Sequence, residues 1–321
     1  MLWVMPRRAH VPDCLRNRPF SQTEALASGV TADMLGGASW RRLFPRVWVH
    51  ADHRMSPQDW FGAAAMALPN RAQLSHVSRI QDLGLDVGRR RPIHFTVSGD
   101  LHLELPGIFV HRTEVLPPLD AIGVTPAAAF IQYCSTARVI DAIIAGDWLL
   151  HGRHMTRIEV SELTRRDDWR PGASQTRSLL PHLDSRSRSP KESETRALLV
   201  FAGLPLPEVN GRLEDVVDSA IIDLLYRRWM LGVEVEGRQH AFDSRQFNTD
   251  IVRYAMLRGV GLEYVQITQE MLRQPRAVVM TVHRKLVERG YAGPAPLFAS
   301  RWSSLFDPIR AAPSRHLRAV S

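Results

Sequence analysis

The stretch "IIDLLYRRWMLGVEVEGRQH", residues 221–240, decides how the C-terminal half of this chain is interpreted. Apolar and β-branched residues fill its first half, and "LGVEVEG" resumes the pattern after "RRWM", as two strands joined by a turn would. A two-residue turn at Arg228-Trp229 would place Asp223 directly opposite Glu234, and a longer turn would shift this register by about one residue. The sequence therefore predicts a hairpin with acidic residues facing each other.

Several carboxylates would meet on this hairpin. Glu234 and Glu236 are two residues apart, so a strand puts both side chains on one face. Carboxylates that face each other across adjacent strands repel one another, and a divalent cation would offset that cost. Oxygen ligands from carboxylates and a backbone carbonyl suit Mg²⁺ or Mn²⁺. The alternative is that one carboxylate points to solvent and that Arg227, Arg228 or Arg253 neutralises the rest.

A histidine follows the second strand. Gly237 permits a bend or a close backbone approach, and His240 lies just beyond it. An imidazole with a pKa near ~6.5 can activate a water or protonate a leaving oxygen at neutral pH. Neighbouring carboxylates would raise the pKa of His240, and a bound metal would lower it. His240 is therefore a candidate proton-transfer residue, the alternative being a histidine in a surface loop.

The segments around the hairpin predict an α/β domain over residues 188–293. A helix should begin with Ser189 as its cap and Pro190 in its first turn, and end at Gly203. Strands are then expected at 218–227, 229–237 and 262–268, with helices at 248–259 and 269–290. This order, α-β-β-α-β-α, indicates an open mixed sheet with helices on its faces.

Residues 18–56 hold two short helix signals and a basic ribbon. Ser21, with Glu24 three residues later, forms a capping box that opens a helix ending at Gly29, and Thr31 can cap a second helix. The run "WRRLFPRVWVH" then alternates apolar and basic residues, as a two-stranded wing does. The pattern predicts a winged helix-turn-helix DNA-binding module, the alternative being any small helical subdomain.

The other segments are assigned from composition and periodicity. We expect a basic arm over 1–17, an α+β middle domain over 57–175, a linker rich in Arg, Ser and Pro over 176–187, and a tail outside the core over 294–321. The chain as a whole is thus predicted to be α+β. The histidines of the middle domain are scattered and lack metal-ligand spacing, so we expect structural or surface roles for His76, His94, His102 and His111.

Composition narrows the class of partner. The chain has 321 residues, 45% of them hydrophobic and 23% charged, with a net charge of +8, in the range of soluble globular proteins of two or three domains. The basic surplus favours nucleic acid as a partner, the alternative being a basic surface with no specific partner. Cys14 and Cys134 are too few for a disulfide framework or a cysteine zinc site. Without a signal peptide or an apolar run of ~18 residues, we expect a cytoplasmic protein with no membrane span.

The C-terminal pattern resembles a known nuclease family. The stretches "ESETRALLVFAGLPLPEVN", "IIDLLYRRWMLGVEVEGRQH" and "DIVRYAMLRGVGLEYVQIT" resemble, in this order and spacing, the Vsr-like branch of the restriction-endonuclease superfamily. Vsr is the very-short-patch mismatch repair endonuclease, and an uncharacterised bacterial domain family shares its pattern. The resemblance implies a restriction-endonuclease-like mixed sheet flanked by helices and a Mg²⁺- or Mn²⁺-dependent endonuclease.

The resemblance also implies roles for individual residues. Glu192 and Arg196 match the Glu and Arg of the family's first core helix, where Glu192 would order a water or the surroundings of the metal and Arg196 would contact DNA. Asp223 matches the strand aspartate that binds the metal, and Val235 the residue whose backbone carbonyl does so. His240 matches the histidine implied in proton transfer.

Glu236 departs from the wider superfamily, which has a lysine at this position. Glu234 and Glu236 would complete the metal ligands, and Glu236 replaces a catalytic histidine of Vsr. Loss of the lysine leaves His240 or an arginine to orient the attacking water, or leaves a domain that binds nucleic acid and cuts poorly. Asp250 and Arg253 match a "D-x-x-R" pair on the next helix, with Arg253 at the catalytic site and Asp250 in a structural role; an intrahelical ion pair is the alternative.

The N-terminal half resembles a second family. "ALASGVTADMLGGASWRRLFPRVWVH" is similar to the winged-helix module of AbiEi-type antitoxins of type IV toxin–antitoxin systems, and "AQLSHVSRIQDLGL" to the region that follows it. The resemblance implies binding to duplex DNA, with the second helix in a groove and three arginines on phosphates: Arg41, Arg42 and Arg46. A cognate toxin or other protein partner is left open.

Two functions follow from these patterns. The first is a DNA-binding protein whose Vsr-like domain hydrolyses DNA phosphodiester bonds with Mg²⁺ or Mn²⁺. The second is an antitoxin-like transcriptional regulator that binds DNA and keeps the nuclease fold as a scaffold. Glu236 at the lysine position favours the second.

Overall fold

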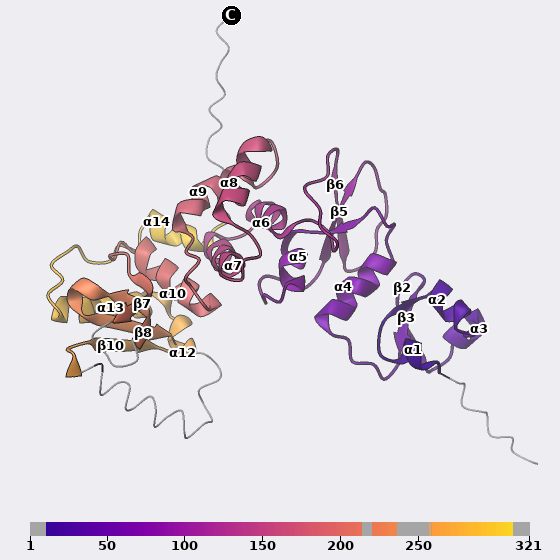
Figure 1. Cartoon of the computed structure of the whole chain (residues 1–321), viewed down its shortest axis with the longest axis horizontal. Helices are drawn as coiled ribbons and strands as arrows, with labels where there is room; N and C mark the ends of the chain where they lie inside the picture. Colours follow the sequence, from indigo (N-terminus) through magenta and orange to yellow (C-terminus); the bar gives the residue numbers. More distant parts are fainter. Residues whose placement is uncertain (1–10, 214–219, 236–256, 258, 311–321) are drawn as a thin grey trace, which may run out of the picture. The chain divides into compact units, whose positions relative to one another are not determined.

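The computed structural model describes residues 11–213, 220–235, 257 and 259–310 (Figure 1). The protein is a mixed α/β chain whose described strands form three small sheets. It divides into two compact units, residues 1–129 and 130–321. No helix in the described part is long and apolar enough to cross a membrane.

The first unit begins with three short helices and a three-stranded antiparallel sheet. The helices are α1 (Asp13–Arg16), α2 (Gln22–Ala27) and α3 (Ala32–Leu35), and the strands, in the order β1-β3-β2, are β1 (Phe20–Ser21), β2 (Trp40–Phe44) and β3 (Val47–His50). The predicted caps are confirmed: Ser21 and Glu24 form the capping box of α2, and the Thr31 hydroxyl accepts from the Met34 N–H at the start of α3.

Part of the expected N-terminal arm is ordered by burial. Helix α1 lies within residues 1–17, and its Leu15 is completely buried in a core with Phe20, Val30 and Trp40. The segment was predicted to be an arm because its composition is basic, and that composition gives no sign that Leu15 is buried. One buried leucine is enough to dock this four-residue helix, and the rest of the expected arm before residue 11 lies outside the described residues.

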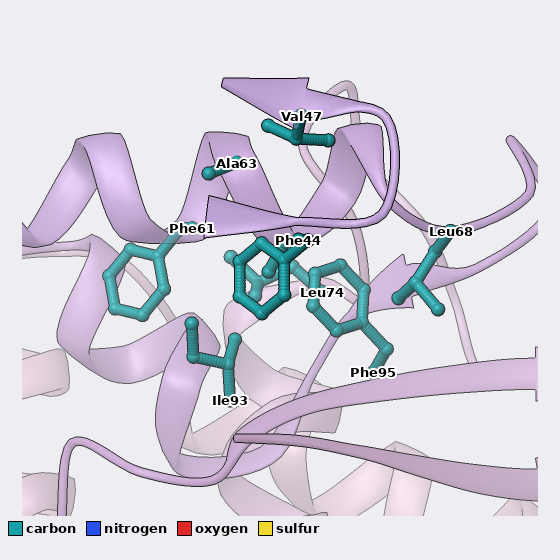
Figure 2. Packing of buried hydrophobic residues seen from close by; sticks show 9 residues of the cluster. Phe44, Val47, Phe61, Ala63, Leu68, Leu74, Ile93 and Phe95 are labelled. Atoms are coloured by element: carbon teal, nitrogen blue, oxygen red, sulfur yellow. The ribbon is translucent and has the colours of Figure 1, made fainter. Parts of the chain in front are cut away.

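A second core joins the hairpin β2–β3 to the rest of the unit. Helix α4 (Pro57–Met66), strand β4 (Gln73–Leu74), helix α5 (His76–Asp82) and strands β5 (Ile93–Ser98) and β6 (Ile108–Thr113) follow, with sheet order β4-β5-β6. Phe44 and Val47 of the hairpin pack with Phe61 of α4 and with Ile93 and Phe95 of β5 (Figure 2). Sequence alone separated these segments at residue 56, yet they share one core.

The second unit contains a helical layer before its sheet. After α6 (Pro126–Cys134) come α7 (Val139–His151), α8 (Arg157–Arg166), α9 (Ala173–Leu179), the 3₁₀ turn η1 (Leu180–His182) and α10 (Pro190–Phe201). The segment expected as a linker, 176–187, belongs to this layer, since Leu179 and Leu183 are buried. The Arg, Ser and Pro content of this segment gives no sign of these apolar contacts.

The sheet of this unit has four strands in the order β10-β9-β8-β7. Strands β7 (Glu208–Leu213), β8 (Ala220–Tyr226) and β9 (Leu231–Val235) are antiparallel neighbours, and β10 (Glu263–Ile267) runs parallel to β9. Strand β7 was not predicted, because Asn210 followed by a glycine is typical of a turn. In the structure Asn210 has a φ of 49° within the strand. Helix α10 also precedes a three-stranded meander, where two antiparallel strands were expected.

Helices cover one face of this sheet. Helix α10 contacts β8, β9 and α13 (Pro275–Glu288), and α13 contacts β9 and β10 (Figure 1). The single helix expected over 269–290 is two helices, α12 (Gln269–Leu272) and α13, because Pro275 starts a new helix.

The expected C-terminal tail is partly folded. It contains α14 (Ser300–Ser303) and the 3₁₀ turn η4 (Ser304–Phe306). Trp302, Leu305 and Ile309 are buried, and the Leu297 N–H donates to the Ala202 carbonyl oxygen at 2.9 Å. Residues 294–310 therefore pack within the second unit.

Candidate functional site

The β8–β9 hairpin has the register on which the acidic site depends. Tyr226 pairs with Leu231 and Leu224 with Val233, and the connection is the 3₁₀ turn η2 (Arg227–Trp229) followed by Met230. One further step in the same register brings Asp223 opposite Glu234. The connection is longer than the two-residue turn considered from sequence, but it takes one residue from each strand, so the register is the same.

Asp223 binds the main chain of the neighbouring strand. The Val235 N–H donates to Asp223 Oδ2 at 2.8 Å. This bond holds the carboxylate against β9 at the residue that follows Glu234. Asp223, Glu234 and Val235 are all partly buried.

Polar residues also lie beside Asp223 and Glu234 on the two outer strands of the sheet. Gln266 of β10 pairs with Glu234. On the other side, Asn210 lies between the pairs Val209–Leu224 and Gly211–Ile222, at the level of Asp223. Asn210, Asp223, Glu234 and Gln266 thus form one polar row, one residue from each strand. Sequence reasoning missed Asn210 and Gln266, because their positions depend on pairings that no local pattern reveals.

Glu192 is buried and joins helix α10 to this row. Its Oε2 accepts from Asn210 Nδ2 at 3.0 Å and from the Arg188 N–H at 2.9 Å. Its own N–H is bound to Ser189 Oγ at 3.2 Å, as the predicted cap requires. The side chain that the family resemblance put near the metal therefore holds the start of α10 to strand β7, beside Asp223.

The family resemblance implied that Arg196 contacts DNA. In the structure its side chain lies in the interior instead of on the surface. Its Nη2 is 2.7 Å from Asp147 Oδ2 on α7, and the two side chains are 5% and 0% exposed. The Asp184 N–H also donates to Asp147 at 2.6 Å. Burial raises the pKa of Asp147, while Arg196 and these hydrogen bonds act against the shift. The pair fastens α10 to α7.

The described part of the predicted metal site is rich in oxygen. Asp223 is bound to the main chain of Val235, and the register puts Glu234 opposite Asp223. Carboxylates and a backbone carbonyl are oxygen donors of the kind that Mg²⁺ and Mn²⁺ prefer. Within the described ranges, no three His, Cys, Asp or Glu side chains are placed to hold one metal ion. The other predicted site residues lie outside the described residues: Glu236, Gly237, His240, Asp250 and Arg253.

The hairpin β2–β3 presents the arginines that were expected to bind phosphates. Arg41, Arg42 and Arg46 are exposed, whereas Val47 and Val49 of the paired strand are buried. Arg41 Nη2 donates to the His53 carbonyl oxygen at 2.9 Å. The hairpin is therefore a basic ribbon with a buried apolar side.

Three histidines that seemed scattered in the sequence form a cluster in the first unit. His94 Nδ1 and His111 Nε2 on the parallel strands β5 and β6 are 2.9 Å apart, and the His76 ring stacks on that of His111 at 3.6 Å. Ser75 Oγ is 3.0 Å from His76 Nδ1. The parallel register, which pairs Thr96 with His111, could not be read from sequence. His102 stays exposed beside Asp100.

Burial controls the charge of this cluster. Burial, together with the charge of neighbouring imidazoles, lowers the pKa of His76 to about 2 and of His111 to about 4. Burial also lowers the pKa of His94. The three rings are therefore neutral at pH 7. His76 has a φ of 51°, a strained backbone conformation for a residue other than glycine.

Comparison with known proteins gives distant relatives. No family model matches the chain. It is similar to two proteins of Mycobacterium tuberculosis, "Uncharacterized protein MT2308" of strain CDC 1551 / Oshkosh and "Uncharacterized protein Rv2248" of strain H37Rv. Each is 24% identical over 215 residues, which cover 65% of this chain and 79% of the relative. Their names state no activity.

Proposed function

We propose that this chain is a DNA-binding protein whose second unit is a metal-dependent endodeoxyribonuclease of the Vsr-like, restriction-endonuclease-like type. The observation that carries the proposal is the bond from the Val235 N–H to Asp223 Oδ2, which brings the Asp223 carboxylate to the strand of Glu234. The strand arrangement supports it: α10 precedes three antiparallel strands, and β10 returns parallel to the third. An acidic pair at the centre of such a sheet can hold a divalent cation.

Each residue has a defined part in this proposal. Asp223, Glu234 and the Val235 carbonyl would hold Mg²⁺ or Mn²⁺, with Glu236 as a further ligand. The ion, when bound, polarises the scissile phosphate and lowers the pKa of a water. His240 moves the proton, and Arg253 stabilises charge on the phosphate. Glu192 acts by positioning, since its carboxylate fixes Asn210 next to Asp223.

The first unit would hold the DNA. Residues 18–56 combine two capped helices with the basic hairpin β2–β3, as a winged helix-turn-helix does. Three exposed arginines, Arg41, Arg42 and Arg46, are available to phosphates, which contribute affinity without reading sequence.

A plasmid assay tests the nuclease proposal. Purified protein is incubated with supercoiled plasmid and Mg²⁺ or Mn²⁺, beside Asp223→Asn and Glu234→Gln. Asparagine can still accept the Val235 N–H, so it removes charge with little change of shape. We expect each variant to lose nicking by about 100-fold or more, beyond the ~10–100-fold effect of an outer-shell ligand. Glu263→Gln is the matched control, an acidic residue on β10 that pairs with Lys285.

The second candidate is an antitoxin-like regulator that binds DNA without cutting it. Glu236 at the superfamily's lysine position favours this function, because no lysine is then placed to orient a water. The same assay separates the two. Tight, salt-dependent DNA binding with no nicking under either metal would reject the nuclease and support the regulator.

A further inference from the structure

A cavity of about 430 Å³ opens in the first unit, between α4, the end of α5 and the start of β5. Its apolar wall includes Trp60, Phe61, Leu85 and Ile93. Phe61 and Ile93 are also members of the core beneath it (Figure 2). Cavities of this size, apolar with a few convergent polar groups, are typical of small-molecule sites.

Planar groups are already stacked at this cavity. The Arg91 guanidinium carbon lies 4.1 Å from the centre of the Trp60 ring. Guanidinium and indole planes both stack readily with a further aromatic ring. A flat heterocycle would therefore extend the Trp60–Arg91 stack within the apolar wall.

The mouth of the cavity carries positive charge. Arg90 and Arg91 line it, and Arg90 is partly neutralised by Asp86 at 3.1 Å. Arg91 has no carboxylate partner among the residues that the structure describes. A guanidinium of this kind suits a phosphate, which it can bind through two parallel hydrogen bonds.

Gln81 forms a fixed part of the cavity wall. The side chain is 93% buried, and its Nε2 is held by the carbonyl oxygens of Val87 at 2.6 Å and Arg89 at 3.1 Å. These two bonds fix the amide orientation. The Oε1 atom is left without a hydrogen-bond donor in the described structure. The same oxygen is shielded from solvent, so Gln81 contributes a rigid part of the cavity wall and not an acceptor for a ligand.

We propose that this cavity binds a nucleotide. The base extends the Trp60–Arg91 stack within the apolar wall, and its phosphate binds Arg91 and Arg90. Two sources share this chemistry, a free mononucleotide and an unstacked nucleotide of a DNA strand. The site does not depend on the acidic residues of the second unit, so it stands apart from the proposed nuclease.

Titration calorimetry of the full chain tests the proposal. The probes are the four deoxynucleoside 5′-monophosphates, with deoxyadenosine and 2-deoxyribose 5-phosphate as the separate halves. We expect each half to bind at least about tenfold more weakly than the whole nucleotide. Arg91→Gln should weaken nucleotide binding by a similar factor, and Trp60→Leu should do the same. Arg89→Gln is the matched control, the neighbouring arginine, which does not line the cavity.

A second measurement distinguishes the two sources. A duplex with 2-aminopurine at a mismatch gains fluorescence when that base leaves the stack. A gain that Arg91→Gln abolishes, with weak mononucleotide binding, supports a strand nucleotide. Tight mononucleotide binding without the gain supports a free nucleotide.

Three results would overturn the nucleotide site. The first is that neither a mononucleotide nor the mismatched duplex binds at concentrations up to about 1 mM. The second is that benzoate binds as tightly as a mononucleotide. The third is that nucleotide binding is unchanged in an Arg91→Gln variant that melts like wild type. Plasmid nicking is read separately with Asp223→Asn, so failure of one proposal is not failure of the other.

Discussion

Arg196 on α10 and Asp147 on α7 form an ion pair in the interior of the second unit, 2.7 Å apart and almost without solvent exposure. Removing one partner leaves the other charge buried and uncompensated. We expect Arg196→Ala to lower the free energy of unfolding by about 3–5 kcal/mol, as measured by urea denaturation. Arg227→Ala, which breaks the exposed pair with Glu208, is the control and should cost about 0–1 kcal/mol.

The double variant Arg196→Met with Asp147→Leu sharpens this prediction. Replacing both charges removes the uncompensated group, so it should recover a large part of the loss in Arg196→Ala. A double variant as unstable as the single one would show that the packing of the side chains, and not their charge, is what α7 and α10 require.

The histidine cluster predicts a loss of stability in acid. Folding lowers the pKa of His76 to about 2 and of His111 to about 4 from an ordinary value of 6.5. Below about pH 6.5 the unfolded chain therefore binds more protons than the folded chain, and unfolding becomes easier as the pH falls toward 4. Each group contributes a slope of at most ~1.4 kcal/mol per pH unit.

Urea denaturation at several pH values checks this slope. The variant His111→Asn should flatten the dependence of the unfolding free energy between pH 6.5 and pH 4, because it removes one of the titrating rings. His102→Asn, at an exposed histidine outside the cluster, is the control. An unchanged slope in His111→Asn would contradict the assignment to this cluster.

The basic hairpin predicts how DNA affinity depends on salt. Each phosphate contact releases counterions, so losing one should reduce the slope of log K against log salt by about 0.9. We expect Arg41→Ala, Arg42→Ala and Arg46→Ala each to show this in fluorescence anisotropy with duplex DNA, and the triple variant to show a larger change. Arg284→Ala, an exposed arginine on α13, is the control. If Arg284→Ala changes the salt slope more than the hairpin variants do, the hairpin is not the DNA-binding surface.

Asn210 combines a strained backbone with a bond to a buried carboxylate. Its φ is 49°, and its Nδ2 lies 3.0 Å from Glu192 Oε2. Asn210→Gly keeps the backbone and removes this bond together with the one from Nδ2 to the Arg186 carbonyl oxygen at 2.7 Å. We expect a cost of at least about 1.5–3 kcal/mol in urea denaturation. Asn210→Ala adds about 1–2 kcal/mol of left-handed strain. Equal stability of the two variants would rule out the strain.

Local signals predicted much of the fold. Caps at Ser21, Thr31 and Ser189 were read correctly because each depends on residues three apart in the chain. The Asp223–Glu234 register was readable because a hairpin is also local. Strand β7 was missed because its pairing with β8 offsets poor strand propensity at Asn210.

The site was harder to read where it depends on distant contacts. The Arg196–Asp147 pair joins residues 49 positions apart, and nothing near Arg196 indicates a buried partner. The histidine cluster needs the parallel pairing of β5 with β6, and the nucleotide cavity needs α4 beside α5. Sequence patterns locate candidate side chains, whereas tertiary packing decides which of them meet.

Hairpin β2–β3 shares a core with α4 and β5, and this determines where the chain can be shortened without exposing apolar side chains. Phe44 and Val47 lie against Phe61 and Phe95, so a polypeptide ending at residue 56 would expose these side chains to water. Such a short product should aggregate or be degraded, whereas one extending past β6 retains every member of that core. The hairpin that carries the arginines shares its core with Phe61 and Ile93, which also line the cavity. A gene segment that encodes a folded hairpin must therefore also encode the cavity.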